Sequence, residues 1–224
     1  MELPLNQIIQ GDCLEVMKTF PDKCVDLVLT DPPYGMDYQS SWRTDKYDKI
    51  DGDISLEWLP IFLSEAFRVM KDNTHIYLFC NDYAISDFRR ELEKAGFTPK
   101  RALVWIKNNH TSGDLEGDYA NKTEFIIWAH KGRRKLNGNR DTNVIHEKRQ
   151  ATEYHPTQKP VDLMRYLIEK STTDSDTILD PFLGSGTTAV ACKQLKRNFI
   201  GIEISKDYCN IAQKRLDTTT KNLF

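Results

Sequence analysis

The sequence lacks the features that mark membrane and secreted proteins. No apolar run approaches the roughly 20 residues that a membrane-spanning helix needs. The N-terminal residues, Met-Glu-Leu-Pro-Leu-Asn, have neither the basic nor the apolar part of a signal peptide. The five cysteines are odd in number, widely spaced and without a C-x-x-C pair, which argues against a disulfide framework or a zinc site. We therefore expect a cytoplasmic protein with reduced thiols and no metal.

The chain also lacks a strong net charge, which is only −2 over 224 residues. The average hides an asymmetry, because residues 100–150 hold 11 Lys/Arg against 6 Asp/Glu, whereas the rest of the chain holds 20 against 27. A basic segment on an acidic body is typical of a nucleic-acid-contacting lobe, although a solvated charged loop fits the charge alone equally well.

Short apolar, β-branched runs alternate with helix-length amphipathic stretches, which predicts a mostly parallel α/β sheet. The predicted strands are residues 7–10, 25–30, 75–80, 102–107, 123–130, 177–180 and 198–203. The predicted helices are residues 59–70, 82–95, a segment starting at 160, 186–195 and 206–216. Two long stretches break the alternation, 36–54 and 108–154 apart from its one strand. We expect a single domain over residues 1–217 and a disordered tail at 218–224.

A glycine-rich turn follows the predicted strand at 177–180. It reads Asp-Pro-Phe-Leu-Gly-Ser-Gly-Thr-Thr-Ala over residues 180–189, and the next strand ends at Glu203. Glycines let a ligand approach the backbone, and the helix N-terminus offers unpaired N–H groups to an anion. Glu203 could accept hydrogen bonds from ribose hydroxyls. The spacing also satisfies the dinucleotide fingerprint, and a plain tight turn is the structural alternative, so this motif alone does not name the ligand.

Asp31-Pro32-Pro33-Tyr34-Gly35 directly follows the apolar strand at 25–30, so it lies at the edge of the sheet where ligands bind in such folds. One candidate ligand for this segment is a nucleic-acid base with an exocyclic amine. Such an aryl amine is a poor nucleophile because its lone pair is delocalised into the ring. Hydrogen bonds from its two protons to Asp31 and to the Pro32 carbonyl would localise that pair on the nitrogen. Tyr34 could stack on the base, an interaction worth about 1–3 kcal/mol. A proline turn without function is the alternative.

Four blocks make the chain similar to the DNA amino-methyltransferases, which methylate adenine-N6 or cytosine-N4, in the class whose catalytic motif precedes the cofactor motif. The blocks lie at residues 11–15, 31–34, 155–160, and 180–188 with 201–203. The resemblance implies a circularly permuted, Rossmann-like methyltransferase fold that uses S-adenosylmethionine. Its sheet would have seven mostly parallel strands, with the last hairpin strand reversed and the strands at 7–10 and 198–203 adjacent. Aspartate in the first tetrad position is typical of adenine-N6 enzymes, whereas cytosine-N4 enzymes of this class more often have serine.

The resemblance also implies roles for single residues. The catalytic tetrad would be Asp31, Pro32, Pro33 and Tyr34. The implied cofactor contacts are Asp12, Cys13, Asp31, Thr157, Lys159, Asp180, Phe182, Gly184, Gly186, Thr187, Thr188 and Glu203. Glu203 would hold the ribose, and Lys159 would lie near the methionyl end. Plain alternatives are a helix N-cap for Asp12 and a snorkelling lysine for Lys159.

The amine of a paired base is inside the duplex, so direct transfer requires flipping the nucleotide out of the helix. We expect double-stranded DNA to contact insertions at 36–54 and 108–154 of a catalytic domain. The predicted DNA contacts are Arg43, Lys46, Lys131, Arg133, Arg134, Lys135, Asn139 and Arg140. A second copy of the chain or a cognate restriction subunit is a further candidate partner. No metal or covalent nucleophile is needed for such a transfer.

Three alternatives stay open at the level of sequence. Cytosine-N4 methylation differs only in the base. An NAD-dependent oxidoreductase would use the glycine turn but leaves the Asp31 tetrad unexplained. A catalytically inactive, DNA-binding homologue is disfavoured by the intact Asp31, Tyr34 and glycines.

Overall fold

The computed structural model describes residues 2–33, 56–110, 116–148 and 158–219. The strands are β1 Gln7–Gln10, β2 Val25–Thr30, β3 Met70–Cys80, β4 Thr98–Pro99, β5 Leu103–Ile106, β6 Thr123–Lys131, β7 Val144–His146, β8 Thr177–Asp180 and β9 Asn198–Glu203. The helices are α1 Cys13–Lys18, α2 Trp58–Val69, α3 Ile85–Lys94, α4 Val161–Ser171, α5 Thr187–Gln194 and α6 Lys206–Thr218. Across these ranges, no helix is long and apolar enough to cross a membrane.

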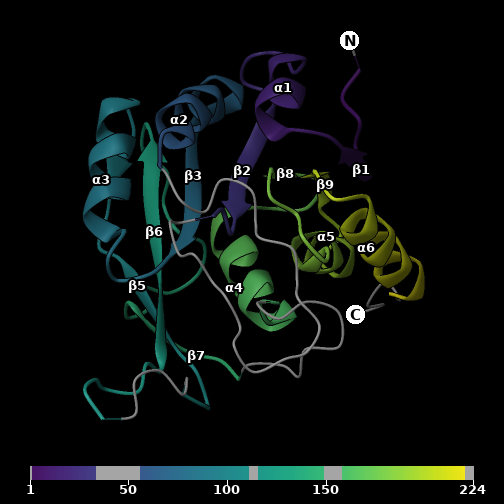
Figure 1. Ribbon diagram of the computed structural model, residues 1–224. Helices are drawn as coiled ribbons and strands as arrows, with labels where there is room; N and C mark the ends of the chain where they lie inside the picture. Colours follow the sequence, from purple (N-terminus) through teal and green to yellow (C-terminus); the bar gives the residue numbers. More distant parts are fainter. Residues whose placement is uncertain (1, 34–55, 111–115, 149–157, 220–224) are drawn as a thin grey trace.

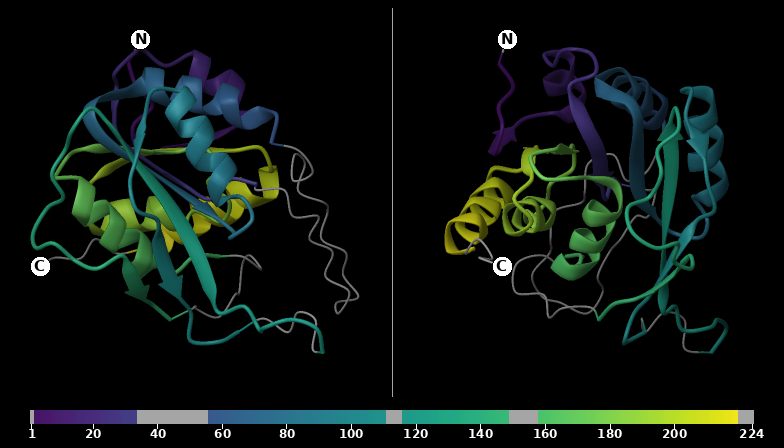
Figure 2. Two further views of the ribbon diagram at one scale, coloured as in Figure 1. Left: turned by 90° about the vertical axis from the view of Figure 1, so that its left-hand side faces the viewer. Right: turned by 180° about the vertical axis from the view of Figure 1, so that it is seen from behind.

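The strands form one twisted sheet between two helical layers (Figure 1). Helices α1, α2 and α3 cover one face and α4, α5 and α6 cover the other, as the view from behind in Figure 2 shows. Each layer contributes to its own apolar cluster, with Phe62 and Phe88 in the first and Leu167 and Ala189 in the second. The sheet is therefore buried on both sides, as expected for parallel strands with helical crossovers.

The strand order is β1-β9-β8-β2-β3-β6-β5-β7, with β4 also paired to β6. Strands β1, β9, β8, β2 and β3 are mutually parallel, and β6 runs antiparallel between β3 and β5. The predicted reversed strand is thus confirmed as β6. The pairing of β1 with β9 joins the first and last strands of the chain, which confirms the permuted order.

The expected count of seven strands was wrong, because the described part of the chain contains nine. All seven predicted strands are present, and the additions are β4 and β7, of two and three residues. Elements this short carry no measurable period. The predicted start of the tail was also wrong at its first residue, since α6 extends through Thr218; residues 220–224 lie outside the described ranges.

Strand β2 explains why the Asp31 segment lies deep in the molecule. All six of its residues are buried, because β2 lies between β3 and β8 with helices on both sides. Val28 belongs to the first apolar cluster, whereas Leu27 and Leu29 belong to the second. The chain leaves this central strand at Thr30, so the next residue, Asp31, emerges in the middle of the sheet edge.

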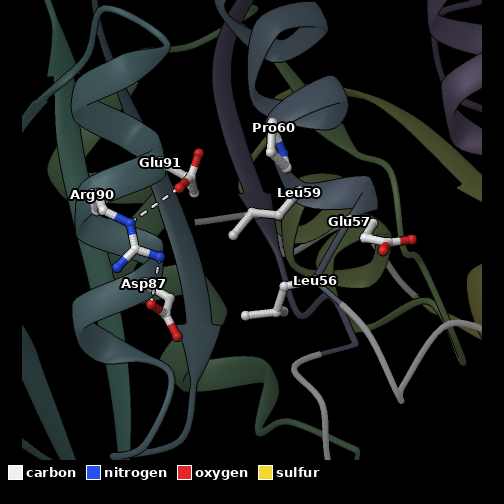
Figure 3. Close-up of a pocket in the computed structure, with 7 residues that line it drawn as sticks. All are labelled: Leu56, Glu57, Leu59, Pro60, Asp87, Arg90 and Glu91. Atoms are coloured by element: carbon white, nitrogen blue, oxygen red, sulfur yellow. Dashed lines mark hydrogen bonds and ion pairs between the residues drawn. The ribbon is translucent and has the colours of Figure 1, made fainter.

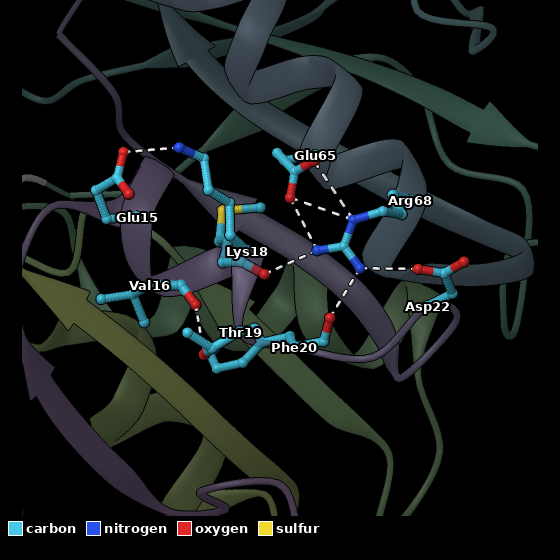
Figure 4. A network of polar contacts seen from close by, with 9 residues as sticks. Glu15, Val16, Lys18, Thr19, Phe20, Asp22, Glu65 and Arg68 are labelled. Carbon is cyan, nitrogen blue, oxygen red and sulfur yellow. Dashed lines mark hydrogen bonds and ion pairs between the residues drawn. The ribbon is translucent and has the colours of Figure 1, made fainter. Parts of the chain in front are cut away.

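Arg68, near the end of α2, fixes the position of α1 (Figure 4). Its guanidinium donates to the carbonyl oxygens of Met17 and Phe20 at 2.8 and 2.7 Å and pairs with Asp22 and Glu65, each at 2.8 Å. Carbonyls at a helix C-terminus lack intrahelical partners, so a cation is favourable there. The contact anchors the far end of α1, and its other end begins beside the candidate site.

Candidate active site

Four parallel neighbours, β1, β9, β8 and β2, end at the same edge of the sheet, which we call the carboxyl edge. Asp12 follows β1, Glu203 ends β9, Asp180 ends β8 and Asp31 follows β2. The backbone N–H of Gly11 donates to the Glu203 carbonyl at 3.0 Å, so the first and last of these segments touch. The structure therefore brings together predicted residues that are far apart in sequence.

Gly184 leaves open space above the turn that follows β8. Its φ is +54°, and a Cβ added there would meet no atom of the described residues within 4 Å. Its N–H donates to Glu203 Oε2 at 2.8 Å, and the Ser205 N–H donates to Oε1 at 2.8 Å. A carboxylate has about four acceptor positions, so each oxygen of Glu203 keeps capacity for a ligand hydroxyl. An open glycine beside a half-exposed carboxylate fits the ribose end of S-adenosylmethionine.

Gly186 has a packing role that the sequence did not predict. Its φ is +84°, and an added Cβ would lie 2.7 Å from the Cβ of Ala212 in α6. Close packing of α6 therefore requires a glycine here, and the contact of Gly186 with a cofactor stays a prediction. Arg215, also in α6, donates to the Ser185 carbonyl at 2.6 Å and to Thr187 Oγ1 at 3.2 Å. Thr187 is thus tied to α6, and sequence reasoning missed the arginine that holds the turn.

Asp180 and Thr188 connect the turn to the neighbouring strand. The buried Asp180 carboxylate accepts from Thr30 Oγ1 at 2.6 Å, from Thr188 Oγ1 at 2.5 Å and from the Phe182 N–H at 3.2 Å. Burial raises the pKa of Asp180 to about 6, although the two threonine hydroxyls oppose the rise. Both residues, predicted as cofactor contacts, therefore have partners within the protein and join β8, α5 and β2. Thr30 was missed because a threonine ending an apolar strand carries no signal of its own.

Phe182, Asp12 and Cys13 border this region. Phe182 packs edge-on against Trp58 and Phe62 of α2, with ring centroids 5.3 and 5.5 Å apart, and stays half-buried. Asp12 is the N-cap of α1, accepting from the Leu14 N–H at 2.8 Å. Burial, with the nearby charges of Asp12 and Glu203, raises the pKa of the Cys13 thiol to about 12. The contacts of these three residues with a cofactor stay predictions.

Asp31 has one oxygen bound within the protein and one left over. Lys159 Nζ donates to Oδ2 at 2.5 Å, whereas Oδ1 is buried and has no hydrogen-bond partner among the described residues. Burial raises the pKa of Asp31, and the Lys159 ammonium opposes that rise. A buried acceptor without a donor costs about 1–3 kcal/mol, so the site is suited to a ligand that supplies one. Pro32 is buried beside it, and Tyr34 lies outside the described residues.

Lys159, predicted near the methionyl end of a cofactor, is buried in the protein. It is 5% exposed and lies between two carboxylates, at 2.5 Å from Asp31 and 3.1 Å from Glu124. Lys107 pairs with Glu124 on the other side at 2.6 Å. The sequence analysis missed Glu124 and Lys107. Each is a single charge at one end of a predicted strand, 123–130 and 102–107, and a charge in that position is ordinary. Thr157, the other residue predicted from this block, lies outside the described residues.

The predicted DNA contacts after β6 do not reach the carboxyl edge. Because β6 is antiparallel, its start pairs with the end of β3, Phe125 with Cys80, whereas its last residue, Lys131, pairs with Thr74 at the opposite edge. The opposite-edge residues are therefore Lys131, Arg133, Arg134 and Lys135.

Lys131, Asn139 and Arg140 were also predicted to contact DNA. Lys131 is buried and donates to the carbonyls of Phe67 and Met70, so its ammonium already has partners within the protein. The Asn139 carbonyl accepts from Lys170 at the end of α4, which keeps Asn139 and Arg140 near the opposite edge too. Arg43 and Lys46 lie outside the described residues.

A pocket between α2 and α3 is separate from this site (Figure 3). It is lined by Leu56, Glu57, Leu59, Pro60, Asp87, Arg90 and Glu91. Arg90 pairs with Asp87 at 2.6 Å and with Glu91 at 3.2 Å, so its positive charge is shared between two carboxylates of this wall. The lining includes no residue predicted for catalysis, cofactor or DNA.

Known proteins are similar to this chain in sequence and in fold. A family model described as DNA methylase matches residues 25–214. YubD of Escherichia coli (strain K12) is 37% identical over 213 residues, covering 95% of this chain and 90% of that protein. The type II methyltransferase M2.MboI of Moraxella bovis is 31% identical over 95% of this chain and 88% of its own length. The crystal structure of the M1.HpyAVI–SAM complex superposes with a TM-score of 0.73 and 32% identity, over 94% of this chain and 98% of that one. The chain belongs to the N6-adenine/N4-cytosine DNA methyltransferase family, whose methyl donor is S-adenosylmethionine.

Proposed function

We propose that this chain transfers a methyl group from S-adenosylmethionine to the N6 amine of adenine at specific sites in duplex DNA. The observation that carries the proposal is Oδ1 of Asp31, a buried acceptor with no donor among the described residues, at the carboxyl edge of the sheet. An exocyclic amine is a donor of the required kind. Family membership, the open Gly184 and the Glu203 carboxylate support the choice of methyl donor.

Within this proposal each part of the chain has a defined task. Bound S-adenosylmethionine supplies an electrophilic methyl group on a positively charged sulfur. Glu203 holds its ribose, and Gly184 lets it approach the turn. Asp31 Oδ1 accepts a hydrogen bond from one amine N–H and the Pro32 carbonyl accepts one from the other, which localises the nitrogen lone pair. Burial keeps water from competing for these two acceptors, and the base reaches them only after it is flipped out of the duplex.

Adenine is preferred over cytosine because aspartate occupies the first tetrad position. Cytosine-N4 methylation is the alternative, since a cytosine amine offers the same two protons. The single catalytic domain at 1–217 with DNA-contacting insertions at 36–54 and 108–154, the cytoplasmic location and a restriction-protecting role belong to the same proposal. So does the possibility of a second copy or a restriction subunit as partner.

The DNA-contacting set is revised by the geometry of the sheet. Arg43 and Lys46 remain in it. Among the described residues of 108–154, the exposed ones nearest the carboxyl edge precede β6 and follow β7, and they include the cations Lys122 and Lys148. We propose these two in place of the residues after β6.

The test incubates the purified chain with isotope-labelled S-adenosylmethionine and duplex DNA of random sequence, followed by nucleoside mass spectrometry. Labelled N6-methyladenine is expected, and it should be absent with Asp31→Ala. N4-methylcytosine as the only product would overturn the choice of base. Intact cofactor and DNA binding without any labelled nucleoside would instead favour an inactive, DNA-binding homologue.

A further inference from the structure

Four charged side chains form a line that ends at Asp31. Lys107 Nζ is 2.6 Å from Glu124 Oε1, Lys159 Nζ is 3.1 Å from Glu124 Oε2, and Lys159 Nζ is 2.5 Å from Asp31 Oδ2. The four residues come from separate segments, after β5, at the start of β6, before α4 and after β2. The charges alternate in sign along the line, so the group as a whole is neutral. We call these four residues the ion-pair chain.

The ion-pair chain lies in the interior of the site. The side chains of Lys159 and Lys107 are 5% and 9% exposed, and those of Glu124 and Asp31 are 21% and 22% exposed. The Lys159 ammonium also lies 5.1 Å from the centroid of the Phe79 ring. Buried ion pairs often contribute no more to stability than well-packed apolar residues of similar size, because their desolvation offsets their attraction. Stability alone is therefore a poor explanation for four charges in this place.

The geometry offers a functional explanation. An ammonium with a single carboxylate partner can move until it lies between both oxygens. Lys159 has a second carboxylate, Glu124, on its other side, and that carboxylate is itself held by Lys107. Lys159 then binds Oδ2 of Asp31 and leaves Oδ1 without a donor. In the proposed reaction Oδ1 is the atom that accepts the hydrogen bond from the amine N–H of the base.

We propose that Glu124 is a positioning residue for Asp31: it holds Lys159 on Oδ2, with Lys107 behind it, and so keeps Oδ1 open for the substrate amine. The inference rests on the proposed function, because it assigns Oδ1 to the substrate. It predicts that Glu124, which acts through Lys159, controls both the rate and its dependence on pH.

The pH dependence has a sign that separates this role from simple structural support. Lys159 lowers the pKa of Asp31 and Glu124 raises it. Loss of Lys159 should therefore move the acid limb of kcat to higher pH, and loss of the Glu124 charge should move it to lower pH. Lys107, Asp180 and Cys80 also act electrostatically with Asp31, and they are unchanged in both variants. General loosening of the fold would not shift the two profiles in opposite directions.

The experiment measures kcat, both KM values and the pH profile for Glu124→Gln and Lys159→Met. Glu124→Gln should lower kcat by about tenfold or more with each KM within about twofold, since a misplacement near the reacting atoms acts on the rate. Lys131→Met is the matched control, because it removes an equally buried lysine at the opposite edge; it should keep kcat and the pH profile. If Glu124→Gln folds poorly, Lys107→Met/Glu124→Gln removes one charge of each sign and is measured in the same way.

A second readout does not depend on turnover. The side-chain carboxyl carbon of Asp31, assigned by its loss in Asp31→Asn, is titrated by NMR in the chain without cofactor or DNA. Its pKa should be lower in Glu124→Gln and higher in Lys159→Met than in the unmodified protein. Unchanged kcat and pKa in Glu124→Gln, or a shift in the same direction as Lys159→Met, would overturn the inference. If the pKa values shift as expected but no N6-methyladenine forms, the proposed function fails instead.

Discussion

Lys159 and Lys131 are both 5% exposed, and they lie at opposite edges of the same sheet. Lys131 donates to the carbonyl oxygens of Phe67 and Met70 at 2.6 and 2.7 Å, with the exposed Asp72 carboxylate 3.7 Å away. Lys159 instead lies between the carboxylates of Asp31 and Glu124. Burial is equal in the two cases, so burial does not tell a structural lysine from a functional one. The partners do.

The polar groups around each lysine differ in kind. At the opposite edge, Ser171 Oγ lies 2.8 Å from both His75 Nδ1 and Tyr77 Oη, and the buried atoms without a partner among the described residues are nitrogens, His130 Nε2 and Arg134 Nε. At the carboxyl edge, the buried atom without a partner among the described residues is a carboxylate oxygen of Asp31, and Gly184 faces open space among those residues. An acceptor beside open space suits a ligand that donates hydrogen bonds.

The largest expected effect is that of Asp31→Ala at the carboxyl edge. Loss of the acceptor for the amine proton should lower kcat by at least about 10²-fold, the usual effect of removing a group that acts on the transition state. Affinity for S-adenosylmethionine should stay within a few-fold, because Glu203 and the glycine turn are intact. Single-turnover methylation and calorimetric titration measure the two effects. Turnover at the unmodified rate would remove the distinction between the edges.

Lys131→Met should show the reverse pattern at the opposite edge. Two backbone carbonyls would lose their donor, each at a cost of about 1–3 kcal/mol, so the free energy of unfolding should fall by about 2–6 kcal/mol. Denaturant unfolding measures this loss. At a temperature where the variant is folded, its kcat should match that of the unmodified protein. A loss of kcat without a loss of stability would show that the opposite edge takes part in function.

Gly184→Ala should weaken cofactor binding more than it weakens the fold. The added Cβ meets no atom of the described residues within 4 Å, so the internal cost within that part of the chain is its left-handed backbone, about 1–2 kcal/mol. The methyl group would occupy the space assigned to the cofactor, and affinity should fall by about tenfold. Gly186→Ala is the matched control, because its Cβ would collide with Ala212 and destabilise the protein. Equal losses of stability in both variants would contradict this difference.

The sequence predicted the frame of the site better than its interior. Residues at strand ends, such as Asp31, Asp180 and Glu203, could be placed at one edge because parallel strands carry their carboxyl ends together. The role of Gly186 could not, since its need for glycine arises from Ala212, which is 26 residues away in the sequence. Glu124 escaped notice for the same reason: its partners come from other segments.

Strand direction was another feature that the sequence did not reveal. The basic residues after β6 looked suitable for DNA in composition, but the antiparallel course of β6 carries them away from Asp31. A charge count along the chain holds no information on which end of a strand faces the ligand. The short strands β4 and β7 were missed because two or three residues hold no pattern.

A smaller effect is expected from pH, and the two edges should respond differently. Burial lowers the pKa of His75 to about 4, helped by the nearby His130, whose own pKa burial also lowers to about 4. Both histidines are neutral in the folded protein and gain a proton on unfolding. Their contribution to stability is therefore present above about pH 6.5 and lost as the pH falls toward 4.

Denaturant unfolding across this window measures the loss, and His75→Asn should flatten it. The same variant should leave the acid limb of kcat in place, since that limb belongs to Asp31. Stability that is constant between pH 6.5 and 4 would contradict a neutral, buried pair at the opposite edge.

The smallest effect is expected from Arg133→Gln/Lys135→Gln, which removes two exposed charges from the opposite edge. Its affinity for duplex DNA should stay within about twofold, because only cations that reach phosphates release counterions. Lys122→Gln/Lys148→Gln removes the same charge from the carboxyl edge. It should weaken binding several-fold and reduce the slope of log affinity against log salt by about one to two. Fluorescence anisotropy over a salt series measures both pairs on the same duplex. A larger loss with Arg133→Gln/Lys135→Gln would mean that DNA extends across the molecule to the opposite edge. The two edges would then differ in catalysis but not in DNA binding.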